Sequence, residues 1–333
     1  MIPFPATPPA KPTLIVGGYG YRNAGDEAIL GGLLQVLGRD HVTVVSRAPA
    51  ETAATHGVRS VGFGGAPRAM LGHRGLVIGG GGLFGRDMGG LGRLLPLAGL
   101  AATVAGREVA LLGIGVDRAM PRATALLLTR LAARASSVTV RDEASRMVLA
   151  DLGAAGRVAP DLSSLVPSAG RAAGARHLRA VGLDPSRRPV VGLALTGVEP
   201  ILAARVREAI VLAADALPNV DFCLVPMSRH PFVATHNDEL LARSVASERP
   251  RVRILVPPDD TRQLLGVFEA FAAAVCMRYH SLLFAERAGI PILPIAYADK
   301  CRQWLAERAM ASLDPSASTL IDGLAAVLAE ASA

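Results

Sequence analysis

The chain has 333 residues, of which 51% are hydrophobic and 19% are charged. This length fits two domains of ordinary size, and the composition excludes an intrinsically disordered chain. The net charge of +7 favours an acidic substrate, an anionic membrane surface or nucleic acid as a partner. The basic residues are mostly arginines dispersed along the chain, and they form no known nucleic-acid-binding motif, so we expect no nucleic-acid partner.

Three further features bear on location. The proline-rich start, residues 1–12, lacks the apolar core of a signal peptide, and we expect it to form a loose arm. The most apolar stretch, residues 94–106, is too short to cross a bilayer, which needs about 20 residues. The cysteines form no metal-binding or redox pattern, which predicts a cytoplasmic protein with buried free thiols at Cys223, Cys276 and Cys301.

In chain order, short apolar segments alternate with longer segments of helical periodicity. In the first half we predict strands at 13–17, 42–46, 75–79, 108–114 and 137–140, with helices at 25–38, 89–105, 120–135 and 142–152. In the second half we predict strands at 189–195, 220–225, 252–256, 273–277 and 291–295, with helices at 199–216, 236–246, 260–270 and 280–288.

This alternation predicts parallel sheets with helical crossovers, and hence an α/β fold of two Rossmann-like domains around a cleft. We place the N-terminal domain at 13–166 and the C-terminal domain at 189–318. Residues 167–188 contain no strand and are assigned as the linker. Residues 319–333 predict a helix that packs back across the junction. Ligands of such sheets bind beyond the carboxyl ends of the strands.

The first candidate site is the glycine loop VGGYGYRNAGDEAIL, residues 16–30. A dinucleotide-binding loop needs a third glycine where this chain has Asn23, and Tyr21 and Arg22 would crowd a pyrophosphate. The loop therefore predicts a tight turn before a helix, with Asp26 as the helix N-cap. The amide of Asn23 could bond a ligand carboxylate or hydroxyl.

A second glycine run, VIGGGGLFGRD, spans residues 77–87. Backbone N–H groups at Gly81 and Gly82 could face an anion at close range. The alternative is a sharp turn, or close packing of the strand on a helix.

Two arginines follow predicted strands. Arg141 comes after the strand at 137–140, where a guanidinium suits a carboxylate or phosphate, although it could instead be a surface residue bound to Asp142. Arg278 and His280 flank the start of a helix, a combination suited to an anion and to proton transfer. His230 and His236 do not have the spacing of a zinc site, and we predict a loop there without metal.

Taken together, the segments GYGYRNAGDEAIL, GGGGLFGRD, GIGVDRA, VRDEAS, APDLSSL and MRYHSLLFAERAGIPILPIAYADK resemble the polysaccharide pyruvyl transferase family, in particular its bacterial cell-wall members. The resemblance implies a fold like that of the GT-B glycosyltransferases. It also implies a reaction in which phosphoenolpyruvate gives its pyruvyl group to two sugar hydroxyls as a cyclic ketal and releases phosphate, without a cofactor.

The resemblance further implies that Arg141, Arg278 and His280 lie at the donor, with the backbone N–H of Tyr279 beside them. We expect His280 to act as general acid, and Asp26 or Glu27 to accept a hydroxyl proton. Relatives often have a Gln-Asp pair where this chain has Arg86-Asp87, and they usually have a proline-bearing version of GIGVDRA. We expect these two departures to affect the acceptor site more than the donor site. Asp87 is a further candidate residue of the acceptor site.

We expect the acceptor saccharide to be linked to a polyprenyl diphosphate, with peripheral contact at the anionic inner face of the cell membrane. A nucleotide-sugar-dependent glycosyltransferase of the same fold is the alternative enzyme. A non-catalytic anion-binding protein is the alternative of another class.

Overall fold

The computed structural model describes residues 4, 8–85, 89–249 and 251–330. By its internal contacts the chain divides into two compact units. Unit 1 comprises Met1–Tyr21 and Gly25–Val166, and unit 2 comprises Arg22–Ala24 and Pro167–Ala333. Each unit is built on one parallel sheet with helices on its faces.

The sheet of unit 1 has seven strands in the order β3-β2-β1-β4-β5-β6-β7. The strands are β1 (Thr13–Val16), β2 (Val42–Val45), β3 (Arg59–Val61), β4 (Gly75–Phe84), β5 (Glu108–Val116), β6 (Ser137–Val140) and β7 (Arg157–Val158). The α-helices are α1 (Ala24–Leu37), α2 (Pro49–His56), α3 (Ala66–Leu71), α4 (Gly89–Val104), α5 (Arg122–Ala132) and α6 (Glu143–Asp151).

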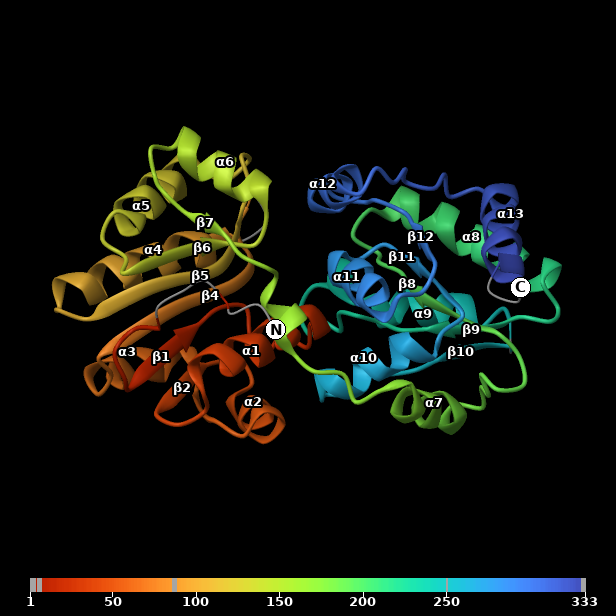
Figure 1. Cartoon of the computed structure of the whole chain (residues 1–333), viewed down its shortest axis with the longest axis horizontal. Helices are drawn as coiled ribbons and strands as arrows, with labels where there is room; N and C mark the ends of the chain where they lie inside the picture. Colours follow the sequence, from red (N-terminus) through yellow and green to blue (C-terminus); the bar gives the residue numbers. More distant parts are fainter. Residues whose placement is uncertain (1–3, 5–7, 86–88, 250, 331–333) are drawn as a thin grey trace. The chain divides into compact units, whose positions relative to one another are not determined.

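Helices cover both faces of this sheet, which explains why its central strands are apolar at successive positions. Val77 of β4 faces α1 and belongs to the core that contains Leu33. Ile78 faces the other side, where α4, α5 and α6 pack with Leu95, Leu128 and Leu149 (Figure 1).

The described part of the N-terminal arm is attached to this sheet. The backbone N–H groups of Arg74 and Gly75 donate to the carbonyl of Pro12, and the N–H of Ala10 donates to Glu108 at 2.8 Å. Residues 10–12 therefore lie along the start of β4 and β5.

Unit 2 has a five-stranded sheet in the order β10-β9-β8-β11-β12. The strands are β8 (Val190–Ala194), β9 (Asp221–Leu224), β10 (Val252–Ile254), β11 (Ala273–Cys276) and β12 (Ile292–Pro294). The α-helices are α7 (Arg171–Ala180), α8 (Pro200–Ala216), α9 (Asp238–Ala246), α10 (Thr261–Ala270), α11 (Tyr279–Ala288), α12 (Asp299–Glu307) and α13 (Ala317–Glu330).

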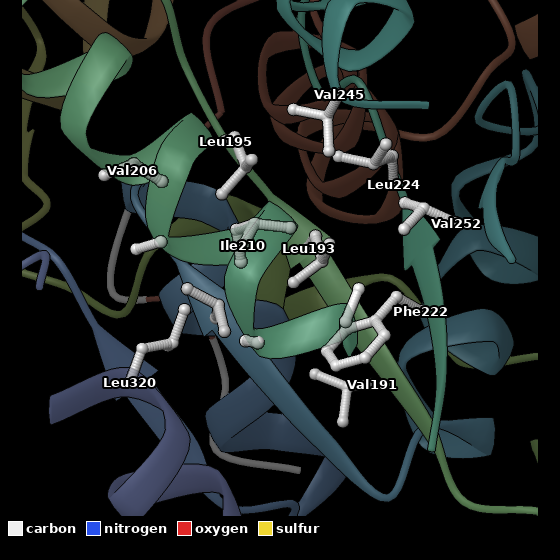
Figure 2. Packing of buried hydrophobic residues seen from close by; sticks show 14 of the residues in the cluster. Val191, Leu193, Leu195, Val206, Ile210, Phe222, Leu224, Val245, Val252 and Leu320 are labelled. Carbon is white, nitrogen blue, oxygen red and sulfur yellow. The ribbon is translucent and has the colours of Figure 1, made fainter. Parts of the chain in front are cut away.

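One face of this sheet forms the core shown in Figure 2, where Val191 and Leu193 of β8 meet Val206 and Ile210 of α8. Leu320 of α13 joins the same core, so the C-terminal helix packs within unit 2. Residues 167–188 also belong to unit 2, because their helix α7 packs on α10. The two helices touch at Gly174, where any side chain would overlap the carbonyl group of Gly266.

The three cysteines are buried free thiols, as predicted. Within the residues that the structure describes, no helix has the length and apolar character needed to span a membrane.

The strand orders locate two places for a ligand. In each sheet the chain first adds strands on one side of its first strand and then crosses to the other side. The two strands that meet at this crossover are β1 and β4 in unit 1, and β8 and β11 in unit 2. In open α/β sheets the carboxyl ends of such neighbouring strands form the binding crevice, because the following loops diverge to opposite faces.

Candidate functional site

The strand ends of unit 2 carry a buried ion pair. Arg278 directly follows the β11 region and is the N-cap residue of α11. Its Nε lies 3.0 Å from Oδ2 of Asp238, and its Nη2 lies 2.5 Å from Oδ1. The Asp238 side chain is 1% exposed and that of Arg278 is 12% exposed. The two side chains therefore form a bidentate ion pair that is shielded from water. This pair fixes the plane of the guanidinium.

Asp238 is held by groups from three segments. Its Oδ2 accepts the backbone N–H of Ser228 at 2.9 Å, and Thr196, which follows β8, also bonds to its side chain. Burial raises the pKa of the Asp238 carboxyl, against the lowering effect of Arg278 and of these donors. Burial also disfavours the charged guanidinium, but the charge of Asp238 outweighs it and raises the pKa of Arg278, with a further contribution from Tyr297.

Arg278 keeps binding capacity beyond this pair. A guanidinium has five N–H groups, and the two bonds to Asp238 use one on Nε and one on Nη2. A further hydrogen bond joins the guanidinium to Tyr297, and the N–H groups beyond these three bonds are the ones that could bind a ligand.

Asn23 lies in the same unit, within the short segment Arg22–Ala24, although the chain before and after this segment belongs to unit 1. It forms an antiparallel bridge with Ser228, supported by bonds from the Ala24 N–H to Met227 and from the Arg229 N–H to Arg22. Ser228 thus connects the Asn23 segment to Asp238, and the structure brings the sequence-predicted Asn23 and Arg278 to one cluster.

His280 is the second residue of α11 and is half-buried. Its ring lies edge-on to that of Tyr279, at 5.4 Å between centroids, and also contacts Phe284. The structure therefore places His280 two residues beyond Arg278, in the first turn of the helix.

In unit 1, Arg141 follows β6 and is buried, with a side chain that is only 7% exposed. Its Nε donates to Asp142 at 3.0 Å, so the alternative is right about this partner and wrong about a surface position. The guanidinium lies over Gly115, where a Cβ would come within 2.8 Å of its Cζ. Asp142 caps α6 as predicted, because it accepts the N–H of Ser145 at 2.7 Å.

The second glycine run is part of a strand and not a turn after it. β4 continues to Phe84, with a bulge and positive φ values at Gly80 and Gly81. Side chains at Gly79 and Gly80 would overlap Leu33 and Ile29, so these two glycines serve close packing of the strand on α1. Gly82 is exposed, with open space in place of a side chain.

The carboxylates after the first glycine loop have different surroundings. Glu27 accepts the N–H of Gly20 at 2.9 Å through Oε1, and its Oε2 lies 2.9 Å from Nε2 of His56. Asp26 lies beside the second glycine run, since a Cβ at Gly81 would be 3.2 Å from its Oδ1. The prediction that Asp26 is the helix N-cap is wrong: α1 begins at Ala24, and Asp26 lies in the first turn.

Buried Tyr19 lies under this loop, and its hydroxyl donates to the carbonyl of Gly79 at 2.7 Å. Burial, and then the charges of Asp26 and Glu27, raise the pKa of Tyr19 well above its ordinary value. Its neutral hydroxyl ties the first glycine loop to the second.

Two remaining predictions concern loops. Asp87 lies outside the described residues. The segment with His230 and His236 is irregular apart from a short 3₁₀ turn, Ala234–His236, and Nδ1 of His230 accepts the N–H groups of Phe232 and Val233. Among the residues that the structure describes, no three possible metal ligands lie together.

A family model for polysaccharide pyruvyl transferases matches residues 23–299 of the chain. The chain belongs to this family. The matched range includes Arg141, Arg278 and His280, the residues for which the sequence resemblance implied a role at the donor, and it begins at Asn23. No curated protein sequence matches the chain.

Solved structures show the fold of this pyruvyl transferase family member. UDP-GlcNAc 2-epimerase from Neisseria meningitidis, bound to UDP-GlcNAc, aligns with a TM-score of 0.65 and 12% identity, over 94% of this chain and 90% of its own. The S. aureus MnaA–UDP co-structure aligns with a TM-score of 0.63 and 10% identity, over 95% and 87%. The E. coli ADP-heptose LPS heptosyltransferase II aligns with 0.55 and 13%, over 96% and 100%. The fold is therefore the predicted GT-B type with parallel α/β sheets.

Sequence reasoning missed several residues that shape these groups. Asp238 was given no role at the site, and His56 and Gly115 were not singled out. Asp238 is separated from Arg278 by 40 positions, and no local pattern links them. One indication that Gly115 matters was present in the sequence, since it lies in GIGVDRA, one of the segments that resemble the family.

Proposed function

We propose that this pyruvyl transferase family member transfers the pyruvyl group of phosphoenolpyruvate to two hydroxyls of a saccharide as a cyclic ketal. The observation that carries the proposal is a buried arginine after a strand end in each unit, Arg141 and Arg278, each oriented by a carboxylate. Phosphoenolpyruvate has about three negative charges near neutral pH, one on its carboxylate and about two on its phosphate. We propose that the two arginines bind these groups, together with the amide of Asn23 and the N–H groups of Gly81, Gly82 and Tyr279.

The reaction needs one proton on the substrate carbon and none from a cofactor. Protonation of C3 turns the CH₂ group into a methyl and leaves an oxocarbenium-like C2. One hydroxyl oxygen attacks C2, the C2–O bond to phosphate breaks, and the second hydroxyl oxygen closes the ring. Of the two hydroxyl protons, one balances the proton used at C3 and the other leaves with phosphate.

His280 is the proposed acid that protonates C3. It lies at the beginning of α11 beside Arg278, and a bound phosphate would favour the protonated imidazole. We expect His280→Ala to lose turnover and to retain phosphoenolpyruvate binding.

Asp26 is a better candidate than Glu27 for the base that accepts a hydroxyl proton. Both oxygens of Glu27 are already engaged, by Gly20 and His56. The Asp26 carboxylate lies beside Gly18 and Gly81, where a Cβ would come 3.5 and 3.2 Å from its oxygens. Asp87 stays an acceptor-site candidate from the sequence alone.

The acceptor is proposed to be a cell-wall or exopolysaccharide unit linked to polyprenyl diphosphate, and the enzyme to work in the cytoplasm at the inner face of the membrane. The direct test is release of phosphate from phosphoenolpyruvate in the presence of such acceptors, with the ketal detected by mass spectrometry.

The alternative is a nucleotide-sugar-dependent glycosyltransferase, because structural neighbours were solved with UDP or UDP-GlcNAc. It predicts thermal stabilisation by UDP and none by phosphoenolpyruvate. A non-catalytic anion-binding protein would bind phosphoenolpyruvate and release no phosphate with any acceptor.

A further inference from the structure

The outer surface of helix α4 is apolar, which is unusual for a helix on the face of a sheet. Its inward residues, including Leu95 and Ala102, are buried in the core of unit 1. From Leu94 onward its exposed residues recur every three or four positions and are all apolar: Leu94, Leu97, Ala98, Ala101 and Val104. A surface helix normally presents polar residues on its outer side, so this face is built for something other than water.

The apolar surface extends beyond α4. Leu71, at the end of α3, is exposed, and its carbonyl accepts a hydrogen bond from Nη2 of Arg107, just after the end of α4. On the neighbouring helix α5, Leu126 is also exposed. We call the exposed residues of α4 together with Leu71 the α4 face.

The charge around the α4 face has one sign. Helices α3, α4 and α5 contain no Asp or Glu, and their arginines are all exposed: Arg68, Arg93, Arg122 and Arg130. On α5, Arg122 and Arg130 lie one turn before and after Leu126, on the same side of the helix. Exposed Leu and Val side chains on three helices whose charged residues are all arginines match the pattern of a helix that lies in the interface of an anionic bilayer.

We infer that the α4 face docks unit 1 on an anionic lipid surface, with the apolar side chains of α4 in the headgroup–acyl boundary and the arginines on the lipid headgroups. A second copy of the chain fits less well, because a twofold contact would set the same arginines against each other. This docking does not depend on the proposed reaction, which takes place at other residues.

The test uses the full-length chain and vesicles of equimolar phosphatidylglycerol and phosphatidylcholine in a co-sedimentation assay. The variant Leu97→Glu/Val104→Glu replaces side chains that are 48% and 88% exposed. The matched control Ile201→Glu/Leu240→Glu makes the same change at side chains that are 82% and 53% exposed in unit 2. All four positions are exposed, so neither variant is expected to unfold.

We expect the wild type and the control to bind, and the α4-face variant to lose at least about 100-fold in vesicle affinity, since two apolar side chains no longer enter the interface. Arg68→Gln/Arg93→Gln is expected to lose about fivefold for each arginine. Binding to pure phosphatidylcholine should be weaker than to the mixed vesicles.

Equal binding by the α4-face variant and the wild type would overturn the inference, as would absence of binding by the wild type. A wild-type dimer that becomes monomeric in the α4-face variant, without vesicle binding, would assign the face to self-association and also overturn it. Thermal stabilisation by phosphoenolpyruvate should be the same in all these variants, so failure here is distinct from failure of the proposed reaction.

Discussion

The buried pair between Asp238 and Arg278 makes a sharp prediction for the variant Asp238→Asn. The substitution keeps the shape of the side chain, removes its charge and replaces one acceptor oxygen with an NH₂ donor. That donor faces either Arg278 or the backbone N–H of Ser228, and both of these are donors themselves. The variant therefore leaves a buried guanidinium without its counter-charge.

The expected cost follows from this burial. Removal of one partner from a buried ion pair costs about 3–5 kcal/mol, because the other charge remains desolvated. Asn keeps one acceptor oxygen, so we expect the free energy of unfolding to fall by about 3 kcal/mol.

The substitution should also weaken ligand binding, because the guanidinium of Arg278 loses its fixed plane. Hydrogen bonds to charged groups contribute about 1.5–3 kcal/mol, so phosphoenolpyruvate should bind about 10- to 100-fold more weakly.

The assay is urea unfolding followed by the fluorescence of Trp304, the single tryptophan of the chain. Trp304 is buried in α12 of unit 2, so it reports on the unit that contains the pair. Asp215→Asn is the matched control, because Asp215 makes a similar two-pronged contact to Arg249 at the surface, with bonds of 2.7 and 2.5 Å. Surface pairs contribute little, so the control should unfold like the wild type. Equal stability of Asp238→Asn and Asp215→Asn would refute the reasoning.

Three other predictions concern unit 1. Gly115→Ala should push the Arg141 guanidinium from its position and weaken phosphoenolpyruvate binding about tenfold or more, measured by calorimetry. Tyr19→Phe should cost about 1 kcal/mol near neutral pH, because a buried hydrogen bond is lost. The raised pKa of Tyr19 means that wild-type stability holds below pH 10 and falls above it, so thermal unfolding should show the gap between the two proteins narrowing there. Asp26→Asn should lower kcat strongly, whereas Glu27→Gln should act mainly on stability because it weakens the bonds to Gly20 and His56; the reverse result would exchange their roles.

The glycine prediction has its own control in Gly64→Ala. Gly64 has open space around it and no positive φ, so this variant should bind phosphoenolpyruvate like the wild type. Equal loss of affinity in Gly115→Ala and Gly64→Ala would show that Gly115 has no specific role in orienting Arg141.

The sequence was sufficient to predict elements whose apolar pattern is strong. Each strand predicted in the two halves is present, because strands buried on both faces have near-continuous apolar residues. The edge strand β3 and the two-residue β7 were missed, since none of their residues is fully buried and they have no such pattern. The helix at Pro49–His56 was missed for the same reason, with only Thr52 and His56 buried.

The candidate residues Arg141 and Arg278 could be singled out from the sequence because each lies at or just after the end of a strand. Their partners differ in this respect. Asp142 is adjacent to Arg141 in sequence and was anticipated, whereas Asp238 reaches Arg278 only through the tertiary fold. The second glycine run could not be assigned from the sequence either, because glycine suits both a bulged strand and a turn. The tertiary structure shows a bulged strand, in which Gly80 packs against Ile29 of α1.

The most direct test of the proposed function is phosphate release from phosphoenolpyruvate with a panel of polyprenyl-diphosphate-linked saccharides. We predict release of phosphate that depends on both the acceptor and His280, with one ketal formed for each phosphate. Transfer of a sugar from a nucleotide-sugar donor, with no phosphate released from phosphoenolpyruvate by any acceptor, would contradict the proposal.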